Sequence, residues 1–345
     1  MTGFHVLNLA YGIQDGQGPG ATEHTLDDYR SGVPRWCSGC GDNGILAAVQ
    51  RLCRDRQLPP EKTVFVSGIG CSSRFPHYMR TYGVHSLHGR ALPIAQGIKL
   101  RRPDLHVFVN TGDGDCCSIG TAHWIHAVRN NMDLTLLLHD NEIYGLTKMQ
   151  MSPTSPQGLH TKTSPQGSWL APLNPLSVTL GVANVSFVAQ CPDWMPDLLE
   201  QLIALAHAHH GFSFLRILQR CPNFLPSLFD DTMRNPSRTL VLEHSAGLVL
   251  TPAQQRAYPQ RAAHDPSDLE RARTLAADLE RLPVGVLYRN ETVPTYDDLR
   301  RSSVAHSSER IREVIEHELD GFSVDAETRR ERASLHLGRS PGQRA

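Results

Sequence analysis

Short apolar strands alternate with amphipathic helices from Trp36 to Leu218, and this alternation is the feature that most restricts the fold. Strand-length apolar runs occupy residues 63–69, 105–110, 134–139, 182–188 and 213–218. Apolar residues at helical spacing occupy 44–54, 91–100, 118–128 and 194–209. Strands separated by helices form a parallel sheet with both faces covered. We therefore predict an α/β protein with a mostly parallel, doubly wound sheet.

The chain has 345 residues, enough for one large α/β unit or two modest domains. We expect an N-terminal arm at 1–33, an α/β domain at 34–225, a C-terminal α/β extension at 226–303, and a helix with a charged tail at 304–345. Within the last two parts, 229–263 is expected to be irregular, 267–282 a helix, 283–288 a strand and 310–319 a helix. Residues 152–175 are rich in Pro, Ser, Thr and Gly and are predicted to form a long functional loop.

Charge and hydropathy exclude several classes of protein. The 34 Lys and Arg residues balance 35 Asp and Glu residues, which argues against nucleic-acid binding through bulk positive charge. No apolar run approaches the ~18 residues that a membrane span needs. The N-terminus lacks the basic start and apolar core of a signal peptide. We therefore expect a cytoplasmic protein, in a compartment where thiols stay reduced.

A Gly–Asp–Gly turn comes directly after the strand predicted at 105–110. Gly112 and Gly114 let the backbone approach a phosphate closely, and the following helix directs its N-terminus to the same place. Asp113 offers an oxygen ligand suited to Mg²⁺. Asn141 follows the next strand along the chain, so its amide meets the carboxylate at one sheet edge. We predict a cation there that bridges two phosphates.

The eight cysteines need another explanation, because disulfides are uncommon in a reducing compartment. Cys37 and Cys40 form a CxxC pair, Cys71 lies in a loop after a strand, and Cys221 precedes Pro222 at the end of another. Four such thiolates suit zinc or an iron–sulfur cluster, and a lone CxxC also suits a redox dithiol. The others are predicted to be packing residues, namely Cys53, Cys116, Cys117 and Cys191.

Several motifs occur in an order that resembles a known family. They are WCSGCGDNGIL, GIGCSSR, YGVHSLHGRALPIAQGIKL, GDGDCCSIG, DNEIYGLTKMQMSPTSPQG and CPNF. The Gly–Asp–Gly turn with its later Asn resembles the thiamine-diphosphate signature. The whole set is similar to the β subunit of the 2-oxoacid:ferredoxin oxidoreductases, most like the 2-oxoglutarate branch. The likeness is dense over residues 34–224 and implies the diphosphate-binding fold of thiamine enzymes.

The resemblance also implies ligands. It assigns Mg²⁺ to Asp113, Asn141 and the backbone carbonyl of Ile143, and a [4Fe-4S] cluster to Cys37, Cys40, Cys71 and Cys221. Contacts with thiamine diphosphate are implied for Ile69, Gly70, Cys71, Ser72, His88, Gly114, Asp115, Gly145 and Leu146, beside Gly112 of the turn. Arg74 and Lys148 are implied to bind the two carboxylates of a dicarboxylic substrate. Asp140 departs from the Asn that is commoner at this position.

The function implied is oxidative decarboxylation of a 2-oxoacid, with 2-oxoglutarate favoured because two cations suit two carboxylates. Coenzyme A would take the acyl group as succinyl-CoA, CO₂ would be released, and electrons would pass through the cluster to ferredoxin, with the reverse reaction also open. In this family the glutamate that activates the cofactor lies on a separate domain. The chain has room for one such domain, so an obligate α subunit is expected, giving a heterodimer.

Three alternatives stay open from the sequence. The same reaction could use pyruvate or branched 2-oxoacids. A non-oxidative thiamine-dependent decarboxylase or ligase with structural zinc would share the diphosphate signature, and iron content would distinguish it. A non-catalytic, zinc-stabilised interaction subunit would lack thiamine diphosphate binding with Mg²⁺.

Overall fold

The computed structural model describes residues 23–304 and divides the chain into two compact units, Met1–Thr295 and Tyr296–Ala345. The first unit contains the sheet and all the residues of the predicted sites. Of the second unit, the described part is the helix α9 (Tyr296–Val304). The helix expected at 310–319 lies outside the described residues, as do residues 1–22 of the expected arm. Tyr29, within that arm, is fully buried and donates a hydrogen bond of 2.8 Å to the Leu58 carbonyl.

A single nine-stranded sheet runs through the first unit in the order β2-β1-β3-β4-β6-β5-β9-β7-β8. The first six strands of this order are parallel, β9 is antiparallel to β5, and β7 and β8 run parallel to β9. The predicted mostly parallel α/β fold is therefore confirmed. The strands are β1 (Thr63–Ser67), β2 (Tyr82–His85), β3 (His106–Gly112), β4 (Leu134–Asp140), β5 (Phe187–Pro192), β6 (Phe212–Leu218), β7 (Thr239–Glu243), β8 (Arg261–Ala263) and β9 (Leu282–Arg289).

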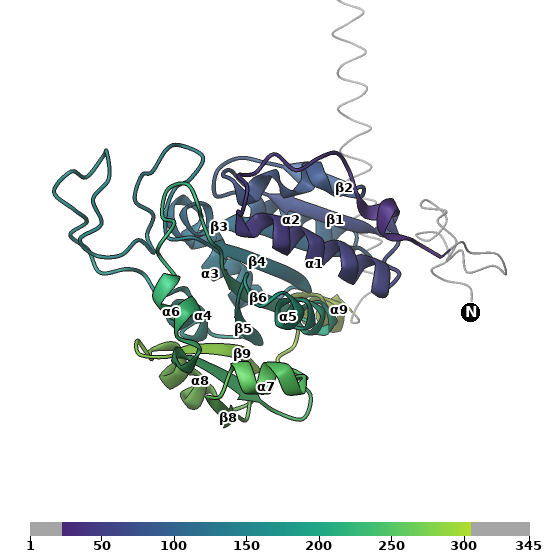
Figure 1. Cartoon of the computed structure of the whole chain (residues 1–345). Helices are drawn as coiled ribbons and strands as arrows, with labels where there is room; N and C mark the ends of the chain where they lie inside the picture. Colours follow the sequence, from purple (N-terminus) through teal and green to yellow (C-terminus); the bar gives the residue numbers. More distant parts are fainter. Residues whose placement is uncertain (1–22, 305–345) are drawn as a thin grey trace, which may run out of the picture. The chain divides into compact units, whose positions relative to one another are not determined.

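Helices cover both faces of this sheet (Figure 1). One face packs on α1 (Gly41–Asp55) and α5 (Pro196–Ala208), and the other on α2 (Ala91–Arg101), α3 (Thr121–Asn130), α4 (Pro175–Leu180) and α8 (Leu269–Ala276). Two short helices, α6 (Asp230–Arg234) and α7 (Pro252–Ala257), complete the unit. Alternation along β1 explains the two cores: Val64 and Val66 face one, and Phe65 faces the other.

Between residues 175 and 192 one expectation was wrong and one helix was not predicted. Residues 182–188 were expected to be a strand, but β5 begins only at Phe187, because Asn184 has φ +66°, which a strand cannot contain. The helix α4 precedes it and was not predicted. Its start is specified by Pro175 in the first turn and by the Asn174 side chain, which accepts hydrogen bonds from two backbone N–H groups.

Other differences have simple physical causes. The helix expected at 118–128 divides at Gly120 into a π-helical turn, Asp115–Ile119, and α3. The expected helix 267–282 is shortened to α8, because the Asp278 carboxylate accepts backbone N–H groups and forms a turn. The stretch 229–263, expected to be irregular, contains β7 and β8. Edge strand β2 escaped prediction because it is mostly exposed and has no apolar period.

Residues 152–174 form a long connection without helix or strand, as predicted, and it projects from the body of the unit in teal (Figure 1). Among the described residues, no helix combines the length and apolar character that crossing a membrane requires.

Candidate active site

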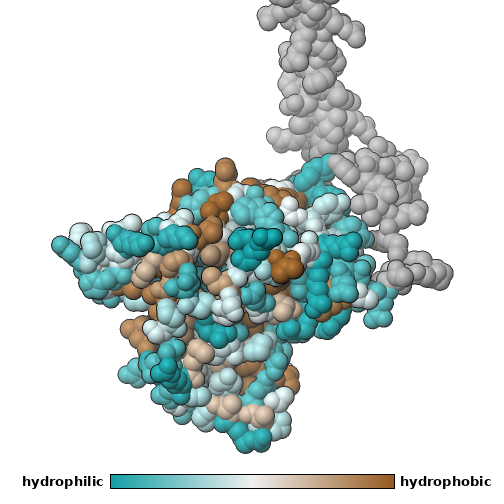
Figure 2. Space-filling view, turned by 45° about the horizontal axis from the view of Figure 1, so that its top comes forward, coloured by the Kyte–Doolittle hydropathy of each residue, from teal (hydrophilic) through white to brown (hydrophobic). Residues whose placement is uncertain are grey.

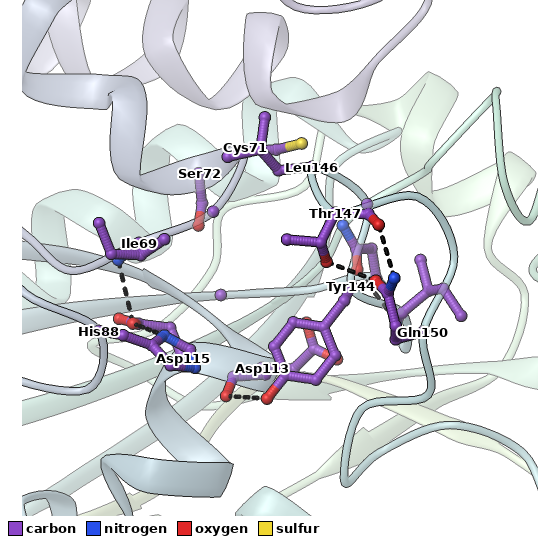
Figure 3. Close-up of a pocket in the computed structure, with 16 residues that line it drawn as sticks. Ile69, Cys71, Ser72, His88, Asp113, Asp115, Tyr144, Leu146, Thr147 and Gln150 are labelled. Carbon is purple, nitrogen blue, oxygen red and sulfur yellow. Dashed lines mark hydrogen bonds and ion pairs between the residues drawn. The ribbon is translucent and has the colours of Figure 1, made fainter. Parts of the chain in front are cut away.

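Three loops meet where β1, β3 and β4 end, and the loop after β2 adds His88 beside them. Since these strands are parallel neighbours, their carboxyl ends lie at one edge of the sheet, where open α/β sheets bind ligands. A cavity of about 370 Å³ lies between the loops (Figure 3). Every residue predicted to contact the cofactor or Mg²⁺ lines it, together with Tyr144, Thr147 and Gln150, which sequence reasoning missed. The missed three belong to the DNEIYGLTKMQ motif that carries Asn141, and this adjacency was the available signal.

A buried carboxylate lies at the floor of the cavity. Asp113 is 2% exposed, and burial, followed by the charge of Asp140, raises its pKa to about 7. The hydroxyl of Thr154 lies 2.8 Å from Asp113 and 2.9 Å from Asp140, but its single proton can serve only one of them at a time. Asp140, the departure from the family pattern, is neutralised by Arg216 at 2.7 Å. No such cation pairs with Asp113 within residues 23–304.

Asn141 and Ile143 complete an oxygen-rich donor set beside Asp113. The Asn141 side-chain N–H donates to the Gln219 side chain at 2.8 Å, and its oxygen accepts from the Ile143 N–H at 3.2 Å. These bonds fix which way the amide points. A carboxylate, an amide oxygen and a backbone carbonyl are ligands that Mg²⁺ favours, and a cation would compensate the buried charge. The donor set therefore fits Mg²⁺.

Glycine is required at several points of the wall. A Cβ on Gly114 would lie 2.3 Å from the Tyr144 ring, whose hydroxyl donates to the Gly114 carbonyl at 2.8 Å. A Cβ on Gly68 would lie 1.9 Å from the Asp115 carboxylate. Gly70 has φ +134°, a conformation that other residues rarely adopt. Gly70 and Gly114 line the cavity and leave backbone at its wall, as the close approach of a diphosphate requires, so the cavity also fits that group.

Asp115 holds two of the loops together. Its carboxylate accepts hydrogen bonds from the Ile69 N–H at 3.0 Å and the Gly89 N–H at 2.7 Å, and from the Thr111 hydroxyl at 2.6 Å. The His88 Nδ1 lies 2.7 Å from the same carboxylate, which orients the imidazole ring toward the hollow seen in Figure 3. The structure thus gives Asp115 a positioning role, and its direct contact with a cofactor stays a prediction.

The two cations predicted to bind substrate do not line the cavity. Arg74 lies in the 3₁₀ helix Ser72–Tyr78, with its guanidinium 5.9 Å from the centre of the Tyr78 ring and 3.5 Å from the Arg35 carbonyl. Lys148 is exposed and has φ +81°. Their roles therefore stay predictions that the cavity geometry does not support directly.

The four candidate cluster cysteines lie near one another at the same edge. Burial raises the pKa of the Cys71 thiol to about 12, with further contributions from Asp42, Cys221 and Cys37. The pKa of Cys40 is raised by burial and by Asp42 and, more weakly, Cys71. Cys71 also lines the cavity, as Figure 3 shows.

These thiols do not form a closed metal site. In the described part of the chain, no three or more His, Cys, Asp or Glu side chains are gathered so as to hold a metal ion. Cys37 is exposed, and the other three are partly exposed. Their chemistry fits thiolate ligation of zinc or of an iron–sulfur cluster. The remaining cysteines are buried, which confirms the prediction for Cys53, Cys116, Cys117 and Cys191.

Two family models match the chain. The model described as "Thiamine pyrophosphate enzyme, C-terminal TPP binding domain" matches residues 68–217, which include all three cavity loops. The model for the C-terminal part of the pyruvate ferredoxin oxidoreductase beta subunit matches residues 254–303. The cavity region thus matches a thiamine pyrophosphate-binding domain, and part of the C-terminal extension matches an oxidoreductase beta subunit.

Relatives cover most of the chain. The 2-oxoglutarate oxidoreductase subunit KorB of Mycobacterium tuberculosis is 39% identical over 84% of this chain and 86% of its own length. The 2-oxoacid:ferredoxin oxidoreductase subunit beta of Saccharolobus solfataricus is 37% identical over 76% of this chain and 84% of its own. The solved structure of the 2-oxoglutarate:ferredoxin oxidoreductase from Magnetococcus marinus, with 2-oxoglutarate, coenzyme A and succinyl-CoA bound, has TM-score 0.72 at 36% identity, covering 85% of this chain and 95% of that chain. This chain therefore belongs to the β-subunit family of the 2-oxoacid:ferredoxin oxidoreductases.

Proposed function

We propose that the chain is the β subunit of a coenzyme A-dependent 2-oxoglutarate:ferredoxin oxidoreductase, which forms succinyl-CoA and CO₂ and also runs in reverse. The observation that carries this proposal is that all residues predicted to hold the diphosphate and its Mg²⁺ line one cavity. Names of relatives add support, since two similar proteins are named for 2-oxoglutarate. Pyruvate and branched 2-oxoacids are the competing substrates.

In this proposal the cavity holds Mg²⁺–thiamine diphosphate. Asp113, Asn141 and the Ile143 carbonyl hold the cation, and the backbone at Gly112 and Gly114 lies against the diphosphate. When bound, thiamine diphosphate supplies a nucleophilic carbanion for the keto carbon and an electron sink for decarboxylation. Asp115 keeps the Ile69 loop and His88 in place around it.

Cys37, Cys40, Cys71 and Cys221 are proposed to hold a [4Fe-4S] cluster, which supplies one-electron redox chemistry. Cys71 supports this role because it belongs both to the cavity wall and to the group of cysteines. Zinc would suit four thiolates but could not accept electrons. Anaerobic purification should give a brown protein that contains iron and acid-labile sulfide, whereas a colourless zinc protein would contradict the cluster.

An α subunit is proposed as the obligate partner. Exposed apolar side chains lie in or near the cavity loops: Leu146 lines the cavity and is 47% exposed, Leu87 precedes the lining residue His88 and is 73% exposed, and Ile119 lies against Gly89 and is 52% exposed. Figure 2 shows brown apolar areas among hydrophilic ones on the face that it presents. Contact with a second subunit would remove these side chains from water. Robust turnover by the β subunit alone would contradict the proposal.

Arg74 and Lys148 are proposed to bind the two carboxylates of 2-oxoglutarate once the complex is assembled. The test is the initial rate of the α–β complex with coenzyme A, ferredoxin and a panel of 2-oxoacids. We expect 2-oxoglutarate to give the highest kcat/KM. Lys148→Ala should raise the KM for 2-oxoglutarate far more than the KM for pyruvate. Equal increases in the two KM values would contradict a role for Lys148 in binding the substrate carboxylate.

A further inference from the structure

One side chain, Gln219, contacts both the proposed magnesium site and the proposed cluster site. It follows directly after β6 and is 1% exposed. Its side-chain oxygen accepts a hydrogen bond of 2.8 Å from Asn141, and its side-chain nitrogen lies 3.3 Å from the Cys40 sulfur. Nothing in the reaction chemistry requires this residue to touch substrate.

The direction of the Gln219 amide follows from its neighbours. The side-chain nitrogen also donates to the Arg220 backbone carbonyl, which can only accept a hydrogen bond. The atom facing that carbonyl must therefore be Nε2, and Oε1 must face Asn141. Nε2 carries two protons, so one bonds the carbonyl and the other is available to Cys40.

The strand pairing explains why one side chain reaches both sites. Asp140 and Leu218 are register partners on β4 and β6, and the Gln219 N–H continues the ladder by donating to the Asp140 carbonyl at 2.9 Å. Asn141 and Gln219 come directly after Asp140 and Leu218, the last residues of the adjacent parallel strands β4 and β6. Cys40 reaches the same place from the start of α1, whose Gly41 N–H donates to the Arg220 carbonyl at 3.1 Å.

We infer that Gln219 is a positioning residue that links the two sites: it orients the Asn141 amide toward Mg²⁺ and donates a hydrogen bond to the Cys40 thiolate. This inference rests on the proposed function. Residues that orient metal ligands commonly affect affinity by about 10–100-fold. A hydrogen bond to a cluster sulfur stabilises the reduced, more negative cluster and so raises its reduction potential.

Two substitutions separate the two contacts. Gln219→Met has similar size but removes both the acceptor and the donor. Gln219→Glu keeps an oxygen that can accept from Asn141, but replaces the donor to Cys40 with a negative charge. Gln50→Met is the matched control, because Gln50 is also a buried glutamine, 6% exposed, whose side chain donates to a backbone carbonyl, Tyr78, and contacts neither site.

The experiment uses the assembled α–β complex and two readouts other than activity. Calorimetry gives the Kd of thiamine diphosphate in saturating Mg²⁺, and an EPR-monitored redox titration gives the midpoint potential of the cluster. We expect Gln219→Met to raise Kd about 10-fold and to lower the potential. Compared with Gln219→Met, Gln219→Glu should lower the midpoint potential of the cluster further but raise the Kd of thiamine diphosphate less. Gln50→Met should change neither.

The outcomes distinguish this inference from the proposed function. If the wild-type complex binds no thiamine diphosphate or contains no iron, the proposed function fails. If the wild type has both but Gln219→Met matches Gln50→Met, or changes only one readout, the link through Gln219 is overturned. If Gln219→Met does not assemble with the α subunit, Gln219→Glu serves as the test. An unchanged midpoint potential of the cluster in Gln219→Glu overturns the inference.

Discussion

The diphosphate cavity and the cysteine group share one sheet edge but are built in opposite ways. The cavity loops are fixed by the protein itself: Asp115 joins two of them, and Tyr144 bonds the Gly114 carbonyl. The cysteines come from three segments of the chain, one with Cys37 and Cys40, one with Cys71 and one with Cys221, and burial raises the pKa of the Cys40 and Cys71 thiols. The cavity loops are thus joined by several hydrogen bonds within the chain, whereas no three His, Cys, Asp or Glu side chains of the described residues are gathered so as to hold a metal ion.

The largest expected effect comes from the residue that belongs to both regions. Cys71→Ala should abolish ferredoxin reduction, because it removes one of the four proposed cluster ligands. Thiamine diphosphate binding should weaken much less, since the cavity loops are held by other bonds. Iron content, EPR and calorimetry measure these separately, with the buried Cys53→Ala as control. Equal loss of the cluster and of thiamine diphosphate binding would show that the cavity depends on the cluster for its organisation.

Asp113→Asn should weaken Mg²⁺-dependent thiamine diphosphate binding by more than about 100-fold, because it removes a proposed metal ligand rather than a residue that orients one. The same change should stabilise the cofactor-free protein by about 1–3 kcal/mol at pH 8, since a buried carboxylate without a cation is lost. Calorimetry and urea denaturation test the two effects. Asp104→Asn, at an exposed ion pair, is the control; a destabilised Asp113→Asn protein would contradict the argument.

The contribution of Asp113 to stability without Mg²⁺ should be lost as pH rises from about 4 to about 7. Burial and the Asp140 charge raise the pKa of Asp113 from 3.8 to about 7, so the folded chain binds more protons than the unfolded chain in this window. Unfolding free energies from urea titrations at one protein concentration measure the slope. Addition of Mg²⁺ and thiamine diphosphate should reduce the slope of unfolding free energy against pH. The slope should be more negative in the wild type than in Asp113→Asn, where the other shifted groups remain, among them Glu142, whose pKa burial raises to about 8, and His207 and His209, whose pKa burial lowers to about 4.

The smallest effect is expected for Tyr144→Phe. The ring remains against Gly114, but the hydroxyl bond to the Gly114 carbonyl is lost, at a cost of about 1 kcal/mol. Thiamine diphosphate affinity should fall about 5-fold or less if the cavity wall is preformed by several bonds. Calorimetry on the complex measures this, and Tyr82→Phe, at an exposed edge strand, is the control. A much larger loss would make this single bond the main organiser of the wall.

The sequence predicted the residues of the cavity wall well because strand ends position them. Parallel strands place their carboxyl ends together, so Asp113 and Asn141 had to lie at one edge once β3 and β4 were recognised. The positions of Arg74 and Lys148 were harder to predict, because neither residue lies at the end of a strand. One is on a 3₁₀ helix and the other has a left-handed backbone, and neither spacing nor hydropathy gives the direction of such side chains.

Elements were missed where local pattern and final environment differ. β2 is an exposed edge strand without an apolar period, and it forms because β1 offers it hydrogen-bonding partners. β7 is short and buried, and the surrounding turns obscured it. In both cases tertiary pairing, which a single sequence does not display, decided the structure.

The reversal of strand direction at β9 has a practical consequence. Because β7, β8 and β9 run opposite to β5, their carboxyl ends open at the other edge of the sheet from the cavity loops. The loop at Ser245 and Ala246 follows β7 there and is exposed. A fluorophore or a surface tether attached to this loop would therefore report on assembly or hold the enzyme on a support without crowding the catalytic edge.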